Sequence, residues 1–266
     1  MFAKPAGIMR IWLPALLVLL TGAAAYAGPD EQGSSSSAPR KSPDFLFGRP
    51  DGSIGIRGNW LFSRASSDWY DFVTDQLTLD RKNFNGPGIG TDLGISITPR
   101  LDVMVGFDYS QNTTASEYRR FVDNNRLPIE QSTLMRGANI SGGIKFALTE
   151  RGREVGRLAW VPRKFVPYVG AGGGAMWFQV RQNGDFVDYV DLSVFTDVFE
   201  SSGWAPTAHA FGGVDVRVLR RAYVTIDARY TWASGNLGPD WIDFDQIDLS
   251  GLRLSAGFNF ILSEVR

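Results

Sequence analysis

The sequence predicts an all-β fold, an eight-stranded antiparallel up-and-down β-barrel, and three observations lead to this prediction. First, segments in which apolar and polar residues alternate with a period of two recur from Gly52 to the last residues of the chain. Second, short and long connections alternate between these segments. Third, the 266 residues include 30 glycines and 13% aromatic residues, as in many β-barrels.

The first 27 residues have the three parts of a secretory signal peptide. Lys4 and Arg10 precede an apolar run at 11–20, and Ala25-Tyr26-Ala27 forms a cleavage motif. Pro14 and the shortness of the run argue against an uncleaved membrane helix. After Ala27 there is no further long apolar run.

The chain therefore divides into four parts. The second part is rich in Ser, Pro and Gly and has no apolar periodicity, so we expect it to be flexible. The expected parts are a signal peptide at 1–27, a leader at 28–47, a barrel at 48–262 and a tail at 263–266.

Each expected strand sorts its side chains onto two faces. In the third, Leu101, Val103 and Val105 alternate with Asp102 and Met104, a pattern that no helix would produce. Most of these segments reach about ten residues, enough for a tilted strand to cross a bilayer. In order, the expected strands cover residues 53–63, 89–98, 101–110, 134–148, 166–181, 204–219, 222–232 and 252–262.

The connections predict which end of the barrel faces outward. Thr98-Pro99-Arg100 and Arg220-Arg221 are tight turns, and the link at 149–164 is longer and basic. Short periplasmic turns and long external loops are typical of outer-membrane barrels. The four expected external loops are the long polar segments at 65–88, 111–133, 182–203 and 233–248.

Aromatic residues should form a girdle at each rim of such a barrel. With this orientation, Trp60, Phe62, Tyr109, Phe178, Trp204, Tyr230 and Trp232 fall near the outer rim. The inner rim would carry Phe146, Tyr168, Phe258 and Phe260.

The last strand carries a more specific pattern. Ser255, Gly257, Phe260 and Leu262 form a polar, x, Gly, x, x, apolar, x, apolar series near the end of the chain. This series resembles the C-terminal insertion signal of bacterial outer-membrane barrels. It implies recognition by the barrel-assembly machinery.

Taken with the eight strands and the glycine-rich run 165–174, this pattern resembles a known family. The chain is similar to small eight-stranded outer-membrane β-barrels of the OmpA transmembrane-domain, OmpW and opacity-protein kind, over residues 48–262. The resemblance implies an eight-stranded antiparallel transmembrane up-and-down β-barrel in the bacterial outer membrane. Such families include adhesins, structural anchors, apolar-solute channels and a few enzymes.

The inward faces hold charges of both signs, which we expect to pair because an unpaired buried charge is costly. Since side chains can fill an eight-stranded barrel, we expect a closed interior rather than a conducting pore. The expected lumen network comprises Arg57, Asp92, Asp102, Asp108, Lys145, Asp215, Arg217, Asp227, Arg229 and Arg253.

Composition excludes several kinds of site. With no cysteine there can be no disulfide, thiolate metal site or cysteine nucleophile. The formal net charge of −1 gives no electrostatic reason to expect a nucleic-acid partner. The external loops are acidic, and calcium or magnesium could bridge them to lipopolysaccharide, but without EF-hand spacing we expect a solvated surface. We predict no cofactor and no metal.

His209 is the only histidine of the chain. A catalytic role would use it as the general base for a serine nucleophile, but no serine stands beside it in the segment Ala208-His209-Ala210-Phe211. We expect His209 to make hydrogen bonds in the lumen instead.

The function expected from the sequence is structural or interactive, without catalysis. Expected partners are outer-membrane lipid, lipopolysaccharide, the barrel-assembly machinery and a possible surface partner at the external loops. Two alternatives stay open: a channel for small apolar solutes, and a lipid A-modifying hydrolase that uses His209.

Overall fold

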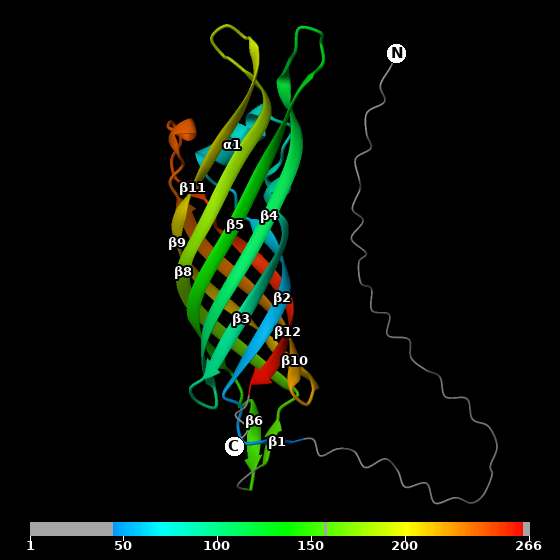
Figure 1. Ribbon diagram of the computed structural model, residues 1–266, viewed down its shortest axis with the longest axis vertical. Coiled ribbons are helices and arrows are strands. Elements are labelled where there is room, and N and C mark those ends of the chain that lie inside the picture. Colours follow the sequence, from blue (N-terminus) through cyan, green and yellow to red (C-terminus); the bar gives the residue numbers. More distant parts are fainter. Residues whose placement is uncertain (1–44, 157–158, 263–266) are drawn as a thin grey trace, which may run out of the picture. The chain divides into compact units, whose positions relative to one another are not determined.

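Eight long antiparallel strands close into a barrel in the computed structural model, which describes residues 45–156 and 159–262 (Figure 1). Each strand pairs with its neighbours in the chain, and the last closes the ring against the first, from Gly251↔Ser63 to Leu262↔Gly52. The predicted eight-stranded barrel is confirmed. Its strands are β2 (Gly52–Ser63), β3 (Gly86–Ser96), β4 (Leu101–Val122), β5 (Pro128–Ala147), β8 (Phe165–Val187), β9 (Val194–Leu219), β10 (Ala222–Gly235) and β12 (Gly251–Leu262).

The barrel wall is apolar on its outer face and polar on its inner face, the reverse of a soluble protein. Ile54, Ile140 and Ile226 are about half exposed on the outer surface, whereas Arg57 and Asn139 are buried in the lumen. Because successive side chains of a strand point to opposite faces, the alternation in the sequence becomes an apolar exterior and a polar interior.

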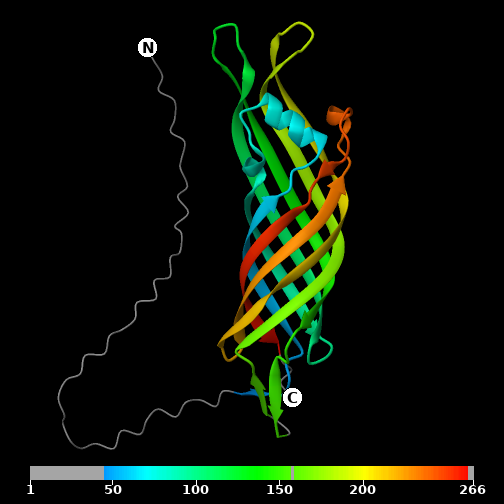
Figure 2. The same ribbon diagram turned by 180° about the vertical axis from the view of Figure 1, so that it is seen from behind.

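Two hairpins rise beyond the rest of the barrel at the external end (Figures 1 and 2). The β4–β5 and β8–β9 ladders run on through the segments 111–133 and 182–203, which we expected to be loops. That expectation was wrong, because hydrophobic alternation marks only the lipid-facing part of a strand. Above the membrane both faces can carry polar residues while the backbone ladder continues.

The first external segment is also more ordered than expected. It contains α1 (Asp68–Gln76) and the short 3-10 helix η1 (Arg81–Phe84). Figure 2 shows α1 close to the base of the two hairpins. Trp69, Tyr70 and Val73 on one side of α1 are buried, so these residues are not the solvated loop residues that their acidic neighbours suggested.

The expected outer girdle is largely present. Trp60, Phe62, Trp204 and Trp232 are exposed on the outside, but Phe178 is buried inside the barrel. At the inner rim, Phe146 and Phe260 are exposed, while Tyr168 is buried and points into the lumen. The face assigned to these two residues of β8 was therefore wrong. Phe178 packs in the apolar upper part of the lumen, and Tyr168 donates a hydrogen bond to the buried carboxylate of Asp227.

Short additional elements lie at both ends of the barrel. At the periplasmic end, β1 (Leu46–Phe47), β6 (Gly152–Val155) and β7 (Ala159–Pro162) form a small sheet, partly in the expected link 149–164. At the external end, the 3-10 helix η2 (Pro239–Trp241) and β11 (Ile247–Asp248) follow β10. No helix in the described part of the chain is long and apolar enough to cross a bilayer.

The signal peptide at 1–27, most of the leader at 28–47 and the tail at 263–266 lie outside the described residues. Their boundaries stay predictions.

Close approach of β5, β8 and β9 requires glycine at position 172. A Cβ on Gly172 would overlap the carbonyl oxygen of Gly142, and it would lie 2.7 Å from the Gly143 Cα and 2.8 Å from His209 Nε2. Two of these neighbours are backbone atoms, which cannot move aside without breaking the ladder.

Gly172→Val should therefore destabilise the barrel by about 1–3 kcal/mol, the usual range for overpacking. The measurement is the urea midpoint of unfolding in lipid vesicles, together with the gel mobility shift between unheated and boiled samples. Ala171→Val, one residue away on the exposed outer face, is the matched control and should leave both unchanged. Equal behaviour of the two variants would contradict this account of Gly172.

Candidate functional site

A buried carboxylate, Asp108 of β4, lies at the centre of the lumen charge network. Its side chain is 1% exposed. Arg57 Nη2 donates to both carboxylate oxygens at 2.8 Å, and Arg229 Nη1 and Arg253 Nη1 lie 3.7 and 3.8 Å from Oδ2. One carboxylate thus joins strands β2, β4, β10 and β12.

Two further carboxylates balance the charge of these arginines. Arg57 also forms an ion pair with Asp92 of β3. Asp227 is buried beside Arg229, and Tyr168 Oη donates to Asp227 Oδ2 at 3.4 Å. Three arginines therefore share the lumen with three aspartates, an arrangement in which burial of the charges is tolerable.

A second level of pairing lies nearer the periplasmic end. Lys145 Nζ of β5 donates to Asp215 Oδ2 of β9 at 2.6 Å, and Thr225 Oγ1 donates to Asp215 Oδ1 at 2.8 Å. The ammonium group also lies 3.8 Å from the centre of the Tyr168 ring, within the range of a cation–π contact. This level links β5, β8, β9 and β10.

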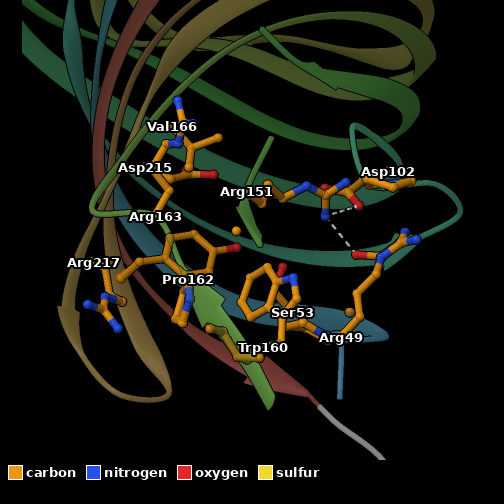
Figure 3. A pocket seen from close by; sticks show the side chains of 17 residues that line it. Arg49, Ser53, Asp102, Arg151, Trp160, Pro162, Arg163, Val166, Asp215 and Arg217 are labelled. Atoms are coloured by element: carbon orange, nitrogen blue, oxygen red, sulfur yellow. Dashed lines mark hydrogen bonds and ion pairs between the residues drawn. The ribbon is translucent and has the colours of Figure 1, made fainter. Parts of the chain in front are cut away.

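A third level closes the periplasmic mouth (Figure 3). Arg151, just before β6, lies 2.6 Å from Asp102 Oδ1 and donates to Ser96 Oγ at 2.8 Å. The cavity around this pair measures about 80 Å³, and Figure 3 shows Arg49, Arg163 and Arg217 among the residues that line it. The small periplasmic sheet is thereby attached to the barrel wall.

The lumen residues named from the sequence thus fall into three groups. Sequence reasoning missed Arg151, because the link 149–164 gave no sign that it folds back over the mouth, and it missed the inward position of Tyr168. The upper group contains Arg57, Asp92, Asp108, Asp227, Arg229 and Arg253; the middle group contains Lys145 and Asp215; and the lower group contains Asp102, with Arg217 at the mouth.

An apolar plug closes the external end. Trp69 and Tyr70 of α1 pack edge to face, with ring centres 5.0 Å apart, and Trp69 lies 5.7 Å from Trp241 of η2. Phe178 and Val180 of β8 belong to the same buried cluster. Burial raises the pKa of Tyr70 well above its usual value, as expected for a phenol without access to water.

Asp248 ties the first external segment to the last. Its Oδ2 accepts hydrogen bonds from Ser66 Oγ at 2.7 Å and Ser66 N at 3.2 Å, and its Oδ1 accepts one from Ser250 N at 3.0 Å. Partial burial alone would raise the pKa of Asp248, but these hydrogen bonds outweigh it and lower the pKa. The plug is therefore fixed at its edge by a carboxylate that favours the ionised form.

His209 lies in the lumen, where it is 4% exposed. It shares a cavity of about 10 Å³ with Ser141, Phe211 and Arg229, and its Nδ1 has no hydrogen-bond partner among the described residues. A cavity of this volume has room for about one water molecule.

The residues of the terminal pattern lie on both faces of β12. Ser255 points into the lumen, whereas Phe260 and Leu262 are exposed on the outer face and pair in register with Ile54 and Gly52. Within residues 45–156 and 159–262, there is no group of three acidic or histidine side chains placed to hold a metal ion.

Comparison with known proteins gives structural matches only. No protein-family model matches the chain, and neither does any curated protein. Among solved structures, the chain is similar to neisserial surface protein A, with 14% identity, a TM-score of 0.44 and coverage of 79% of this chain and 98% of that one. It is also similar to Ail of Yersinia pestis, with 15% identity, a TM-score of 0.43 and coverage of 79% and 99%. A third similar structure is the outer-membrane protein OprG of Pseudomonas aeruginosa, with 14% identity, a TM-score of 0.43 and coverage of 82% of this chain and 100% of that one.

The distribution of side chains in this chain decides what kind of barrel it is. A closed ring of eight strands has no unpaired edge, its outer surface carries apolar and aromatic side chains, and its charges are inside. A soluble barrel would have to cover that apolar surface, but lipid covers it in a membrane. The chain is an eight-stranded β-barrel of the bacterial outer membrane.

Asp108→Asn should destabilise the barrel strongly, because it removes the central negative charge and leaves three buried arginines with only two aspartates, Asp92 and Asp227. Breaking a buried ion pair typically costs about 3–5 kcal/mol. The free energy of unfolding in urea, measured in lipid vesicles, tests this. Glu200→Gln affects a half-exposed pair with Arg181 and an exposed hydrogen bond from Gln179, so that control should lose less than about 1 kcal/mol. A loss from Asp108→Asn as small as that of the control would contradict the central role of Asp108.

Proposed function

We propose that this protein is a non-conducting, non-catalytic outer-membrane barrel that supports the envelope and presents a rigid external surface to partners. The observation that carries the proposal is the closure of the barrel at several levels. Three layers of ion pairs and an apolar plug occupy the lumen, and the cavities lined by lumen residues measure about 80, 50, 20 and 10 Å³.

A channel for small apolar solutes is a weaker alternative. It requires a continuous cavity, but charged side chains that fill the lumen would have to separate before a solute could pass. Breaking the Asp108 cluster or the Lys145–Asp215 pair would expose unpaired charge to an apolar solute, which is unfavourable.

A lipid A hydrolase that uses His209 is also a weaker alternative. The cavity of about 10 Å³ that contains His209 and Ser141 is far too small for a lipid, and it lies inside the barrel rather than at a membrane-facing surface. The proposed role therefore involves no catalytic residue.

The external surface supports a role in contact. The β4–β5 and β8–β9 hairpins extend beyond the other strands, and backbone ladders order both of them. In the segments 181–203 and 234–249 only one basic residue, Arg181, stands among many carboxylates, whereas the segment 111–133 has three basic and three acidic residues. The β8–β9 hairpin and the last external segment therefore favour a cationic partner surface over a sulfated one. The carboxylates are Asp185, Asp188, Asp191, Asp197, Glu200, Asp240, Asp243, Asp245 and Asp248.

Two further partners belong to the same proposal. We propose that lipopolysaccharide surrounds the external half of the wall. We also propose that Ser255, Gly257, Phe260 and Leu262 act as the insertion signal for the barrel-assembly machinery. The outward exposure of Phe260 and Leu262 supports recognition of this strand before the ring closes.

The closed lumen predicts that the protein does not conduct. In planar lipid bilayers, folded protein should give no stable conductance steps, because each level of ion pairs blocks ion passage. Deletion of the plug segment 66–84 should not open the barrel, since the charged levels remain. Regular conductance steps from the heat-shiftable wild-type protein would overturn the proposed function.

The acidic external surface predicts selective, salt-sensitive contact. Protein in neutral phosphatidylcholine nanodiscs should bind immobilised polylysine but not heparin, with binding that weakens as salt rises. The triple variant Asp185→Asn, Asp188→Asn and Asp197→Asn should lose most of this binding, whereas Asp51→Asn at the periplasmic end should not. Equal retention of all three proteins would contradict contact through the external hairpins.

A further inference from the structure

A cavity at the external end lies between α1, the two hairpins and η2, and measures about 200 Å³. Aromatic side chains from five elements line it, including Phe72, Tyr118, Phe186, Phe195 and Trp241. Phe72 and Phe195 are 38% and 39% exposed, so the cavity opens to the outside rather than into the lumen. We call it the aromatic cup.

The volume of the aromatic cup limits the size of an occupant. An apolar cavity of about 150 Å³ accommodates benzene. A cavity of about 200 Å³ therefore holds one aromatic ring with a short substituent.

Two buried polar atoms in the cup lack partners. Gln131 Oε1 is an acceptor and Trp241 Nε1 is a donor, and both side chains line the cavity while being only 5% and 6% exposed. Neither atom has a hydrogen-bond partner in the described part of the chain. Buried polar groups are normally paired, and a ligand hydroxyl, which both donates and accepts, could satisfy either atom.

The charge of the cup favours a cation. Asp240 is the charged residue among those that line it, and its Oδ2 accepts the backbone N–H of Glu200 at 2.9 Å. The faces of aromatic rings also attract ammonium groups. Both features oppose the binding of an anion of the same size.

We propose that the aromatic cup binds a small hydroxylated aromatic amine from the external medium, a molecule of the size and charge of tyramine. The ring occupies the aromatic walls, the ammonium group lies near Asp240, and the hydroxyl group donates to Gln131 Oε1. This proposal goes beyond the surface contact proposed above and does not depend on it. The closed lumen makes the cup a site of recognition, with no route inward.

The test uses the full barrel in neutral nanodiscs and three probes that share a phenol ring. Isothermal titration should give saturable one-to-one binding of tyramine, a cation. The neutral p-cresol should bind roughly tenfold more weakly, and the anion 4-hydroxyphenylacetate more weakly still. No saturable binding of tyramine, or equal affinity for the anion, would overturn the proposal.

Two variants test the named groups. Gln131→Leu removes the unpaired acceptor, and it should weaken binding of both tyramine and p-cresol by roughly tenfold. Asp240→Asn keeps an oxygen for the Glu200 N–H but removes the charge, so it should abolish the preference for tyramine over p-cresol. If either variant binds all three probes as wild type does, the corresponding contact is wrong and the proposal fails.

Matched controls exclude general effects. Gln246→Leu and Asp243→Asn change the same residue types at exposed positions outside the cup, and both should bind tyramine as wild type does. A retained heat-dependent gel shift shows that each variant is folded. If a control variant lost tyramine binding, the effect would come from the general charge or stability of the loops. That result would also overturn the proposed binding site.

Discussion

The structure depends on the ion cluster around Asp108. A barrel of eight strands leaves a narrow interior from which water is largely excluded, so each charge placed there needs a partner of the opposite sign within a few ångströms. Asp108 supplies that partner to Arg57, Arg229 and Arg253 at once. Because these four residues come from four different strands, the cluster also connects β2, β4, β10 and β12 across the lumen.

Closure of the lumen follows from the same constraint at successive heights. Above the cluster, the apolar side chains of α1 and the upper wall exclude water, and below it Lys145 and Arg151 find carboxylates on other strands. A polar interior is therefore compatible with a closed one, since paired charges occupy the space that a pore would need. This arrangement confines contact with small molecules and partners to the two ends of the barrel.

The external end combines rigidity with a recessed binding surface. Backbone ladders carry the β4–β5 and β8–β9 hairpins above the barrel, the first with a register shift between Glu117 and Val122, and the plug beneath them holds α1 and η2 in place. The aromatic cup lies where these four elements meet, so its walls come from well-separated parts of the sequence. A site of this kind needs the plug for its floor, and this gives the plug a role besides closing the barrel.

The sequence alone determined the strand number and the inward position of the charged residues, because both depend on a period of two, which is a local property. Only the tertiary structure decided which charges meet, since Asp108 and Arg253 are far apart in the chain and their pairing depends on strand tilt and register. It also decided that α1 folds into a plug, that Phe178 and Tyr168 point inward, and that Arg151 closes the mouth. Hydrophobic alternation in the sequence indicates which side chains face lipid. It could not place α1, Phe178, Tyr168 and Arg151, because their contacts are with other parts of the protein.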